Sequence, residues 1–162
     1  MLMTIPLKPA EFTLKVIVFN SARAGRASIR ALASRARSAA SSSTASWRAT
    51  MALYRTCQAL AADLGISDRV HFTGWVDHDQ LAEFYASARF AVVPSRWPEP
   101  FGMVGIEAMA RGRPVVGFAV GGIPDWLEHG VTGLLAPEAD TDALGAHIQT
   151  LLEDKTLAQR LG

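Results

Sequence analysis

The sequence predicts an α/β protein with an open, doubly wound, Rossmann-like parallel sheet. From residue 50 onward, short apolar segments alternate with amphipathic helical segments. These short segments are apolar on both sides, which is typical of parallel strands covered by helices on both faces of a sheet. Apolar residues make up 49% of the 162-residue chain, which is enough for the packed core of one domain.

The first predicted elements follow from apolar spacing. The segment 12–19, FTLKVIVF, is β-branched and apolar apart from one lysine, which predicts a buried strand. Apolar residues at three- and four-residue spacing predict a helix over residues 50–64. A short strand follows at 70–73, and Asp77 is placed to cap the next helix. The apolar segment 90–93 is the next strand.

The second half of the chain continues the alternation. A loop, SRWPEPFG, leads into a helix at about 103–111 that ends before a glycine. The sequence PVVGF at 114–118 predicts another buried strand. A short helix is expected between the glycine turns of 121–133, and a small strand at 134–135. Asp or Thr at 140 or 141 then caps a helix that reaches residue 152.

Residues 1–50 differ in composition from the rest of the chain. They carry eight basic residues and one acidic residue, a net charge of +7, whereas residues 51–162 carry eight basic and fourteen acidic residues, a net charge of −6. The stretch 21–50 is almost entirely Ala, Ser and Arg and has few groups able to form a core. We expect residues 1–50 to hold one strand and a disordered or non-native segment, and residues 51–162 to form a partial α/β domain.

The sequence disfavours several other classes of protein and site. A nucleic-acid or membrane arm would use the basic residues, but the run lacks interleaved aromatic residues and an amphipathic face. No membrane-spanning apolar stretch and no secretory signal pattern occurs, so we expect a cytoplasmic protein. Cys57 is the single cysteine, which excludes an internal disulfide, and no Cys or His residues have metal-ligand spacing.

The loop and helix after the 90–93 strand hold the strongest functional pattern. Glu99 precedes the helix, and Glu107 lies about one turn inside it. Between them, residues 101–104 offer unpaired backbone N–H groups at a helix amino terminus, where the free donors and the macrodipole favour phosphate. An ionised Glu beyond such a site accepts hydrogen bonds from two vicinal hydroxyls. The pattern indicates a nucleotide sugar, although glutamates also occur near helix amino termini because they stabilise the dipole.

The strings PSRWPEPFGMVGIEAMARGRPVV and GGIPDWLEHGVTGLL resemble the carboxyl-terminal, donor-binding domain of the family 4 glycosyltransferases, also called glycosyl transferases group 1. These are GT-B enzymes with a Glu-x7-Glu signature. The resemblance extends from LGISDRVHFTGWV to LLED, about half of the chain. It implies most of one half of a GT-B fold, and a reaction that transfers a sugar from a nucleoside-diphosphate sugar with retention of configuration. It implies no metal or other cofactor.

The resemblance also implies roles for residues in and just after the loop SRWPEPFG (residues 95–102), called the signature loop below. Glu99 is the catalytic-site carboxylate, which contacts the transferred sugar and positions it without acting as a covalent nucleophile. The backbone amides that hold the sugar and the diphosphate are those of Phe101, Gly102, Met103 and Val104.

Glu107 is the residue that the resemblance assigns to the ribose hydroxyls, and Trp75 and Val76 are assigned to the edge of the base. A complete family member also has an acceptor domain, and its donor domain begins with a Gly-Arg loop and a lysine that hold the diphosphate. None of these is recognisable in this sequence. Two explanations of these departures stay open: residues 1 to about 50 derive from a truncated or frame-shifted reading frame, or a separate polypeptide supplies the acceptor domain. We expect residues 51–162 to be a partial donor-nucleotide-sugar-binding domain with little activity by itself. The alternative is a non-catalytic remnant that binds a nucleotide sugar.

Overall fold

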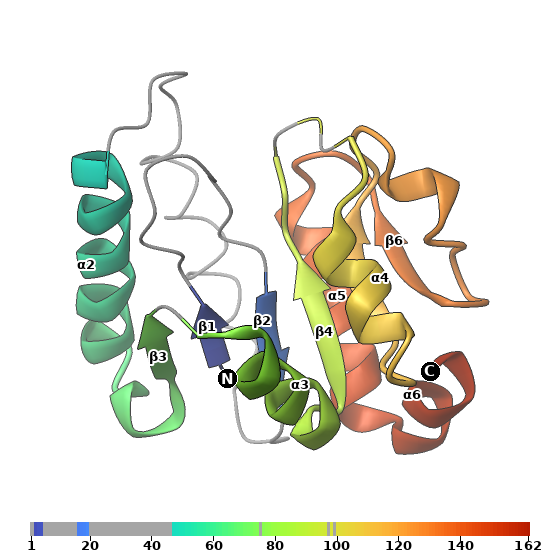
Figure 1. Cartoon of the computed structure of the whole chain (residues 1–162), viewed down its shortest axis with the longest axis horizontal. Helices are drawn as coiled ribbons and strands as arrows, with labels where there is room; N and C mark the ends of the chain where they lie inside the picture. Colours follow the sequence, from blue (N-terminus) through green and yellow to red (C-terminus); the bar gives the residue numbers. More distant parts are fainter. Residues whose placement is uncertain (1, 5–15, 20–46, 75, 97, 99) are drawn as a thin grey trace.

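A computed structural model of the chain describes residues 2–4, 16–19, 47–74, 76–96, 98 and 100–162. In these residues, one twisted sheet lies between helices (Figure 1). The strands are β1 (Leu2–Thr4), β2 (Val16–Phe19), β3 (His71–Gly74), β4 (Phe90–Val93), β5 (Val115–Phe118) and β6 (Gly133–Ala136). Their order in the sheet is β3-β1-β2-β4-β5-β6.

Strand direction divides the sheet unevenly. β4, β5 and β6 are parallel, and β1 is parallel to β3. β2 runs antiparallel to both of its neighbours, β1 and β4. Because β2 is antiparallel to both β1 and β4, those two strands run in the same direction as each other. Every strand except β2 therefore has its carboxyl end at the same edge of the sheet.

Helices cover both faces of this sheet. They are α2 (Trp47–Asp63), η1 (Ser67–Arg69), α3 (His78–Ser87), α4 (Met103–Met109), η2 (Ile123–Asp125), α5 (Thr141–Glu153) and α6 (Lys155–Leu161). Figure 1 shows α4 in front of the sheet and α5 behind it; α4 contacts β4 and β5, and α5 contacts β5 and β6. None of the helices described is long and apolar enough to cross a membrane.

The α/β class and the Rossmann-like arrangement predicted from the sequence are confirmed. Two details differ from the prediction. β1 was not predicted, and β2, inside the predicted strand 12–19, is antiparallel to its neighbours. Apolar periodicity reports that a strand is buried, but it carries no information on strand direction. The Ala/Ser/Arg run before Trp47 lies outside the described residues, so the expectation of a disordered or non-native segment stays a prediction.

The core explains why the strands β4 and β5 are apolar along their whole length. All four residues of β4 and all four of β5 are buried, so both faces of each strand are covered. Burial of one Val, Leu or Phe side chain stabilises a fold by about 1.5–3 kcal/mol. The largest completely buried side chains include Phe90, Phe118, Ile123, Leu127 and Leu144. The buried strands β4 and β5 thereby hold the starting points of the loops that follow them.

The predicted helix starts are confirmed at two aspartates. Asp77 accepts a hydrogen bond from the Gln80 backbone, and the Gln80 side chain accepts one from the Asp77 backbone, forming a capping box. Asp140 accepts hydrogen bonds from the first amides of α5. Each cap satisfies backbone donors that a helix leaves unpaired, so each aspartate determines where its helix begins.

A histidine pair lies where α5 packs against the edge strand β6. The rings of His129 and His147 have centroids 5.2 Å apart. His129 Nδ1 lies 3.1 Å from both the backbone N and the backbone O of Leu135. Burial, and then the charge of His129, lowers the pKa of His147, while a backbone hydrogen bond to Leu135 and the charge of Asp140 act in the opposite direction.

This lowered pKa predicts that the fold loses stability in mild acid. The unfolded chain binds a proton at His147 near the ordinary value of 6.5, whereas the folded chain resists it. The free energy of unfolding should therefore fall as pH decreases through about 6.5 and level off below the folded-state pKa. Urea denaturation between about pH 5 and about pH 7.5 measures the slope, which His147→Gln should flatten. His78→Gln, at an exposed position of α3, is the matched control, and an unchanged slope in His147→Gln would contradict the prediction.

Candidate functional site

The carboxyl ends of β3, β4, β5 and β6 meet at one edge of the sheet. The loop from β4 reaches the amino terminus of α4 at this edge (Figure 1). Residues 119–122 follow β5 at the same edge. Open α/β sheets bind their ligands beyond the carboxyl ends of the strands, so this edge is the candidate site.

Gly102 shapes the start of α4. It is the N-cap residue, is buried, and has the left-handed backbone conformation φ 64°, ψ 46°. A Cβ at this position would lie 3.3 Å from Cζ2 of Trp126, so both the backbone angle and the available space favour glycine. Glycine has no side chain to accept a hydrogen bond, and the first amides of α4 therefore have no side-chain cap from the N-cap residue.

The indole of Trp126 packs directly on the first turn of α4. Its Nε1 donates a hydrogen bond of 2.6 Å to the carbonyl oxygen of Phe101. A Cβ at Gly105 would lie 2.2 Å from the indole Cη2, which shows how closely the ring approaches the helix backbone. The short helix predicted in 121–133 is η2, and it delivers Trp126 to this position.

The segment after β5 approaches the signature loop equally closely. A Cβ at Gly122 would lie 2.2 Å from the carbonyl oxygen of Pro100, so only glycine lets the two backbones come together. The predicted site loop and the glycine pair that follows β5 are thus held against each other without an intervening side chain.

Phe101 and Met103 form an apolar rim at the amino terminus of α4. Their side chains are 66% and 56% exposed, and they are two of the three large apolar residues found exposed in the part of the chain that the structure describes. Val104, by contrast, packs against the core. The predicted diphosphate-binding residues therefore lie together at the first turn of α4. The side chains of Phe101 and Met103 are exposed to solvent, and that of Val104 packs against the core.

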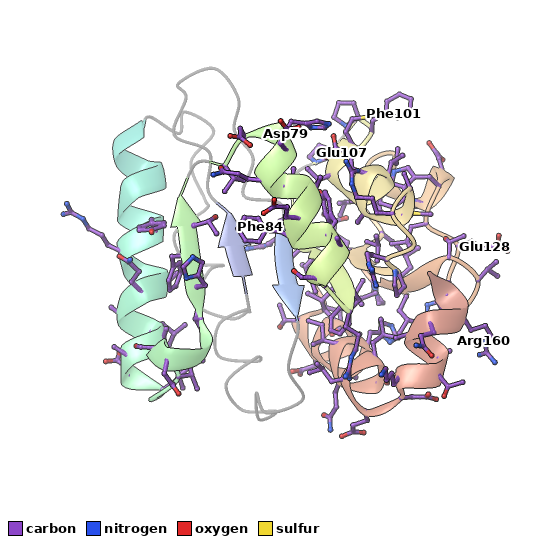
Figure 2. The ribbon with its side chains drawn as sticks, turned by 60° about the horizontal axis from the view of Figure 1, so that its bottom comes forward. Asp79, Phe84, Phe101, Glu107, Glu128 and Arg160 are labelled. Atoms are coloured by element: carbon purple, nitrogen blue, oxygen red, sulfur yellow. The ribbon has the colours of Figure 1, made fainter. Side chains whose placement is uncertain are left out.

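Glu107 lies one turn further along α4 and is half-buried. Figure 2 shows Glu107 and Phe101 at the same end of the molecule. Side chains on a helix lean toward its amino terminus, so the Glu107 carboxylate is directed back toward the turn that contains Val104. Glu107, the predicted ribose ligand, thus lies in α4 within about one turn of the backbone amides that are predicted to bind the diphosphate.

Tyr85 reaches this turn from α3 and was not predicted to be a site residue. Its hydroxyl donates a hydrogen bond of 3.1 Å to the carbonyl oxygen of Val104, and its ring is completely buried. Burial, followed by the charge of Glu107 and a hydrogen bond with its side chain, raises the pKa of Tyr85 far above its ordinary value, although the charge of Arg111 opposes the shift. The hydroxyl of a buried tyrosine usually has a hydrogen-bond partner. A tyrosine on the apolar face of the predicted helix was therefore the only sign in the sequence that this residue contacts another element.

Of the two residues predicted to lie at the edge of the base, the structure describes one. Val76 is half-buried and immediately precedes the cap of α3, whereas Trp75 and Glu99 lie outside the described residues. Asp79, in the first turn of α3, lies at the same end of the molecule as Phe101 and Glu107 in Figure 2. The residues that follow β3 and those that follow β4 therefore share one end of the domain.

Across the described residues, no group of three or more His, Cys, Asp or Glu side chains is arranged to hold a metal ion. Residues 53–162 match the model of the family described as glycosyl transferases group 1. The chain belongs to this family. The match covers the site loop, α4 and every later element.

Curated members of the glycosyl transferases group 1 family are similar over a limited length. The chain is 41% identical over 105 residues to D-inositol 3-phosphate glycosyltransferase of Streptomyces avermitilis, a match that covers 65% of this chain and 22% of that protein. It is 46% identical over 98 residues to the protein of the same name from Mycobacteroides abscessus, covering 60% of this chain and 22% of the relative. The chain thus spans less than a quarter of the length of these relatives.

Solved glycosyltransferase structures share the fold. Sucrose-phosphate synthase from Thermosynechococcus elongatus superposes with a TM-score of 0.66 at 36% identity, covering 84% of this chain and 35% of that one. Anabaena HepE, solved in complex with UDP and glucose and in complex with UDP-glucose, superposes with a TM-score of 0.63 at 31% identity, covering 68% and 30%. These structures show that the chain has the fold of one GT-B domain.

Gly105→Ala tests the contact between Trp126 and α4. The added methyl group would overlap the six-membered ring of the indole, so the free energy of unfolding should fall by about 1–3 kcal/mol. Trp126→Phe lacks those ring atoms, and Gly105→Ala should cost clearly less in that background. Urea denaturation of the four proteins of the double-mutant cycle measures the coupling. An equal loss in both backgrounds would contradict the packing described.

Proposed function

We propose that this chain binds the nucleoside-diphosphate sugar donor of a retaining glycosyltransferase at the amino terminus of α4. The observation that carries the proposal is the first turn of α4, which begins at the side-chain-less cap Gly102 and holds the half-buried Glu107 one turn later. Unpaired amides suit a diphosphate, and a carboxylate beside them suits vicinal hydroxyls. Their combination matches the two polar parts of such a donor.

The diphosphate would bind the backbone amides of residues 101–104. These N–H groups and the helix dipole favour negative charge, while the absence of a Cβ at Gly102 makes room for the Trp126 indole that packs on the same turn. As the sugar–phosphate bond breaks, the same donors would stabilise the charge that develops on the leaving diphosphate. In this proposal neither a metal ion nor another cofactor takes part.

The remaining contacts follow the family pattern. Glu107 would accept hydrogen bonds from the two ribose hydroxyls, and Glu99 would contact and position the transferred sugar. The edge of the base would lie against Trp75 and Val76. The apolar side chains of Phe101 and Met103, exposed at the rim, would lie beside the bound donor and limit the access of water to it.

A UDP-sugar is the first donor to test, because the Anabaena HepE structures contain UDP or UDP-glucose. Transfer itself needs an acceptor site. Because the chain spans 22% of its curated relatives, we propose that transfer requires an acceptor domain in addition to the residues described. A separate polypeptide would be one source of that domain.

Glu107→Gln is the direct test of the ribose contact. Removal of the charge should weaken UDP-glucose binding about tenfold or more, because a hydrogen bond to a charged group contributes about 1.5–3 kcal/mol. Isothermal titration calorimetry with UDP-, GDP- and ADP-glucose measures the affinities. Glu128→Gln, at the exposed turn before β6 labelled in Figure 2, is the matched control and should bind like the wild type. Equal affinity of Glu107→Gln and wild type would refute the assignment.

Donor binding should not depend on a divalent metal. Addition of EDTA is expected to leave the Kd for UDP-glucose within about twofold of its value in buffer, because the proposed phosphate ligands are backbone amides. The same titration repeated with Mg²⁺ or Mn²⁺ provides the comparison. A loss of binding in EDTA that either metal restores would overturn the metal-independent proposal.

A further inference from the structure

The buried hydroxyl of Tyr85 connects two elements of the proposed site. Tyr85 belongs to α3 and bonds the carbonyl oxygen of Val104, which is 19 residues away in the second position of α4. The ring is completely buried, so water cannot replace this bond without moving the helices. The first turn of α4 is thereby held from the side of α3, in addition to the bond from Trp126 to Phe101.

Helix geometry brings the same hydroxyl close to Glu107. Val104 and Glu107 are three residues apart and lie on one face of α4. The Glu107 side chain leans back over the turn of Val104, where the Tyr85 hydroxyl lies. The charge of Glu107 and a hydrogen bond with its side chain contribute, after burial, to the raised pKa of Tyr85. A phenol is a neutral hydrogen-bond donor at ordinary pH, and burial and the neighbouring carboxylate keep it so.

Arg111 completes this arrangement from the next turn of α4. Its guanidinium carbon lies 5.4 Å from the centroid of the Tyr85 ring, and Nη1 donates a hydrogen bond of 3.1 Å to the backbone carbonyl of Glu107. The ring of Tyr85 is thus held between the core and a cation. This contact restricts where the hydroxyl can lie.

We infer that Tyr85 is a positioning residue whose buried hydroxyl, held at the carbonyl oxygen of Val104, orients the Glu107 carboxylate toward the ribose hydroxyls of the donor. The inference rests on the proposed function, since it assigns Tyr85 a role that acts through Glu107. A hydroxyl with a purely structural role would contribute to the stability of the fold but not to the affinity for the donor. The two roles differ in whether the effect depends on Glu107 and on the ribose.

Tyr85→Phe keeps the ring and removes the hydroxyl. It should weaken UDP-glucose binding about three- to tenfold, measured by calorimetry, as expected for one neutral hydrogen bond. The same substitution in a Glu107→Gln background should have no further effect. A UDP-glucose analogue that lacks the 2′- and 3′-hydroxyls should bind the wild type and the Tyr85→Phe variant equally weakly, so the comparison isolates the ribose contact.

Tyr54→Phe is the matched control. Tyr54 is the other tyrosine of the chain, lies on α2, and bonds the carbonyl oxygen of Phe72 at 3.5 Å. The variant should bind UDP-glucose like the wild type. Equal weakening by Tyr85→Phe with both donors, or in both Glu107 backgrounds, would overturn the positioning role. Unchanged binding by Glu107→Gln would instead mean that the proposed ribose contact has failed.

A measurement on the tyrosine itself keeps the test valid if Tyr85→Phe does not fold. With only two tyrosines, 3-fluorotyrosine gives two ¹⁹F resonances, which Tyr54→Phe assigns. Addition of UDP-glucose at a saturating concentration should shift the Tyr85 resonance in the wild type. The shift should be absent in Glu107→Gln at equal donor occupancy. A Tyr85 resonance that does not move in the wild type would overturn the inference.

Discussion

The packing of Trp126 on the first turn of α4 is the contact on which the candidate site depends. Glycine at 102 and at 105 lets the indole lie against the helix backbone, and the indole N–H bonds the carbonyl oxygen of Phe101. On the other side of the same turn, Tyr85 bonds the carbonyl oxygen of Val104. Both bonds hold carbonyl oxygens and leave amides for a ligand. A short helix that begins without a side-chain cap is therefore made rigid by its neighbours.

In the proposed function, rigidity at this turn would serve diphosphate binding. A diphosphate bound by backbone amides gains from donors that are already oriented, because no reorganisation is needed when charge develops on it. The uniformly buried strands β4 and β5 provide the fixed base for the loops that carry these donors. Family membership and the shared GT-B fold come from the comparisons with known proteins, whereas the geometry of α4 comes from the structure of this chain, so the proposed donor site draws on independent observations.

Sequence patterns predicted what depends on local chemistry. The caps at Asp77 and Asp140, the buried strands and the start of α4 follow from spacing and capping over a few residues. The direction of β2 and the hydroxyl of Tyr85 depend on contacts between elements distant in sequence, which apolar periodicity does not report. The steric need for Gly105 belongs to the same class, because it is visible only once Trp126 is in place.

The histidine that contacts β6 also bears on the open edge of the sheet. β6 is the last strand of the sheet, and an open edge presents unpaired backbone groups on which another chain can pair. His129 Nδ1 lies within hydrogen-bonding distance of the Leu135 amide and carbonyl, so a side chain of the same molecule occupies that position. The imidazole thus occupies backbone groups that an added strand would need, so a strand that paired with β6 at Leu135 would first have to displace His129.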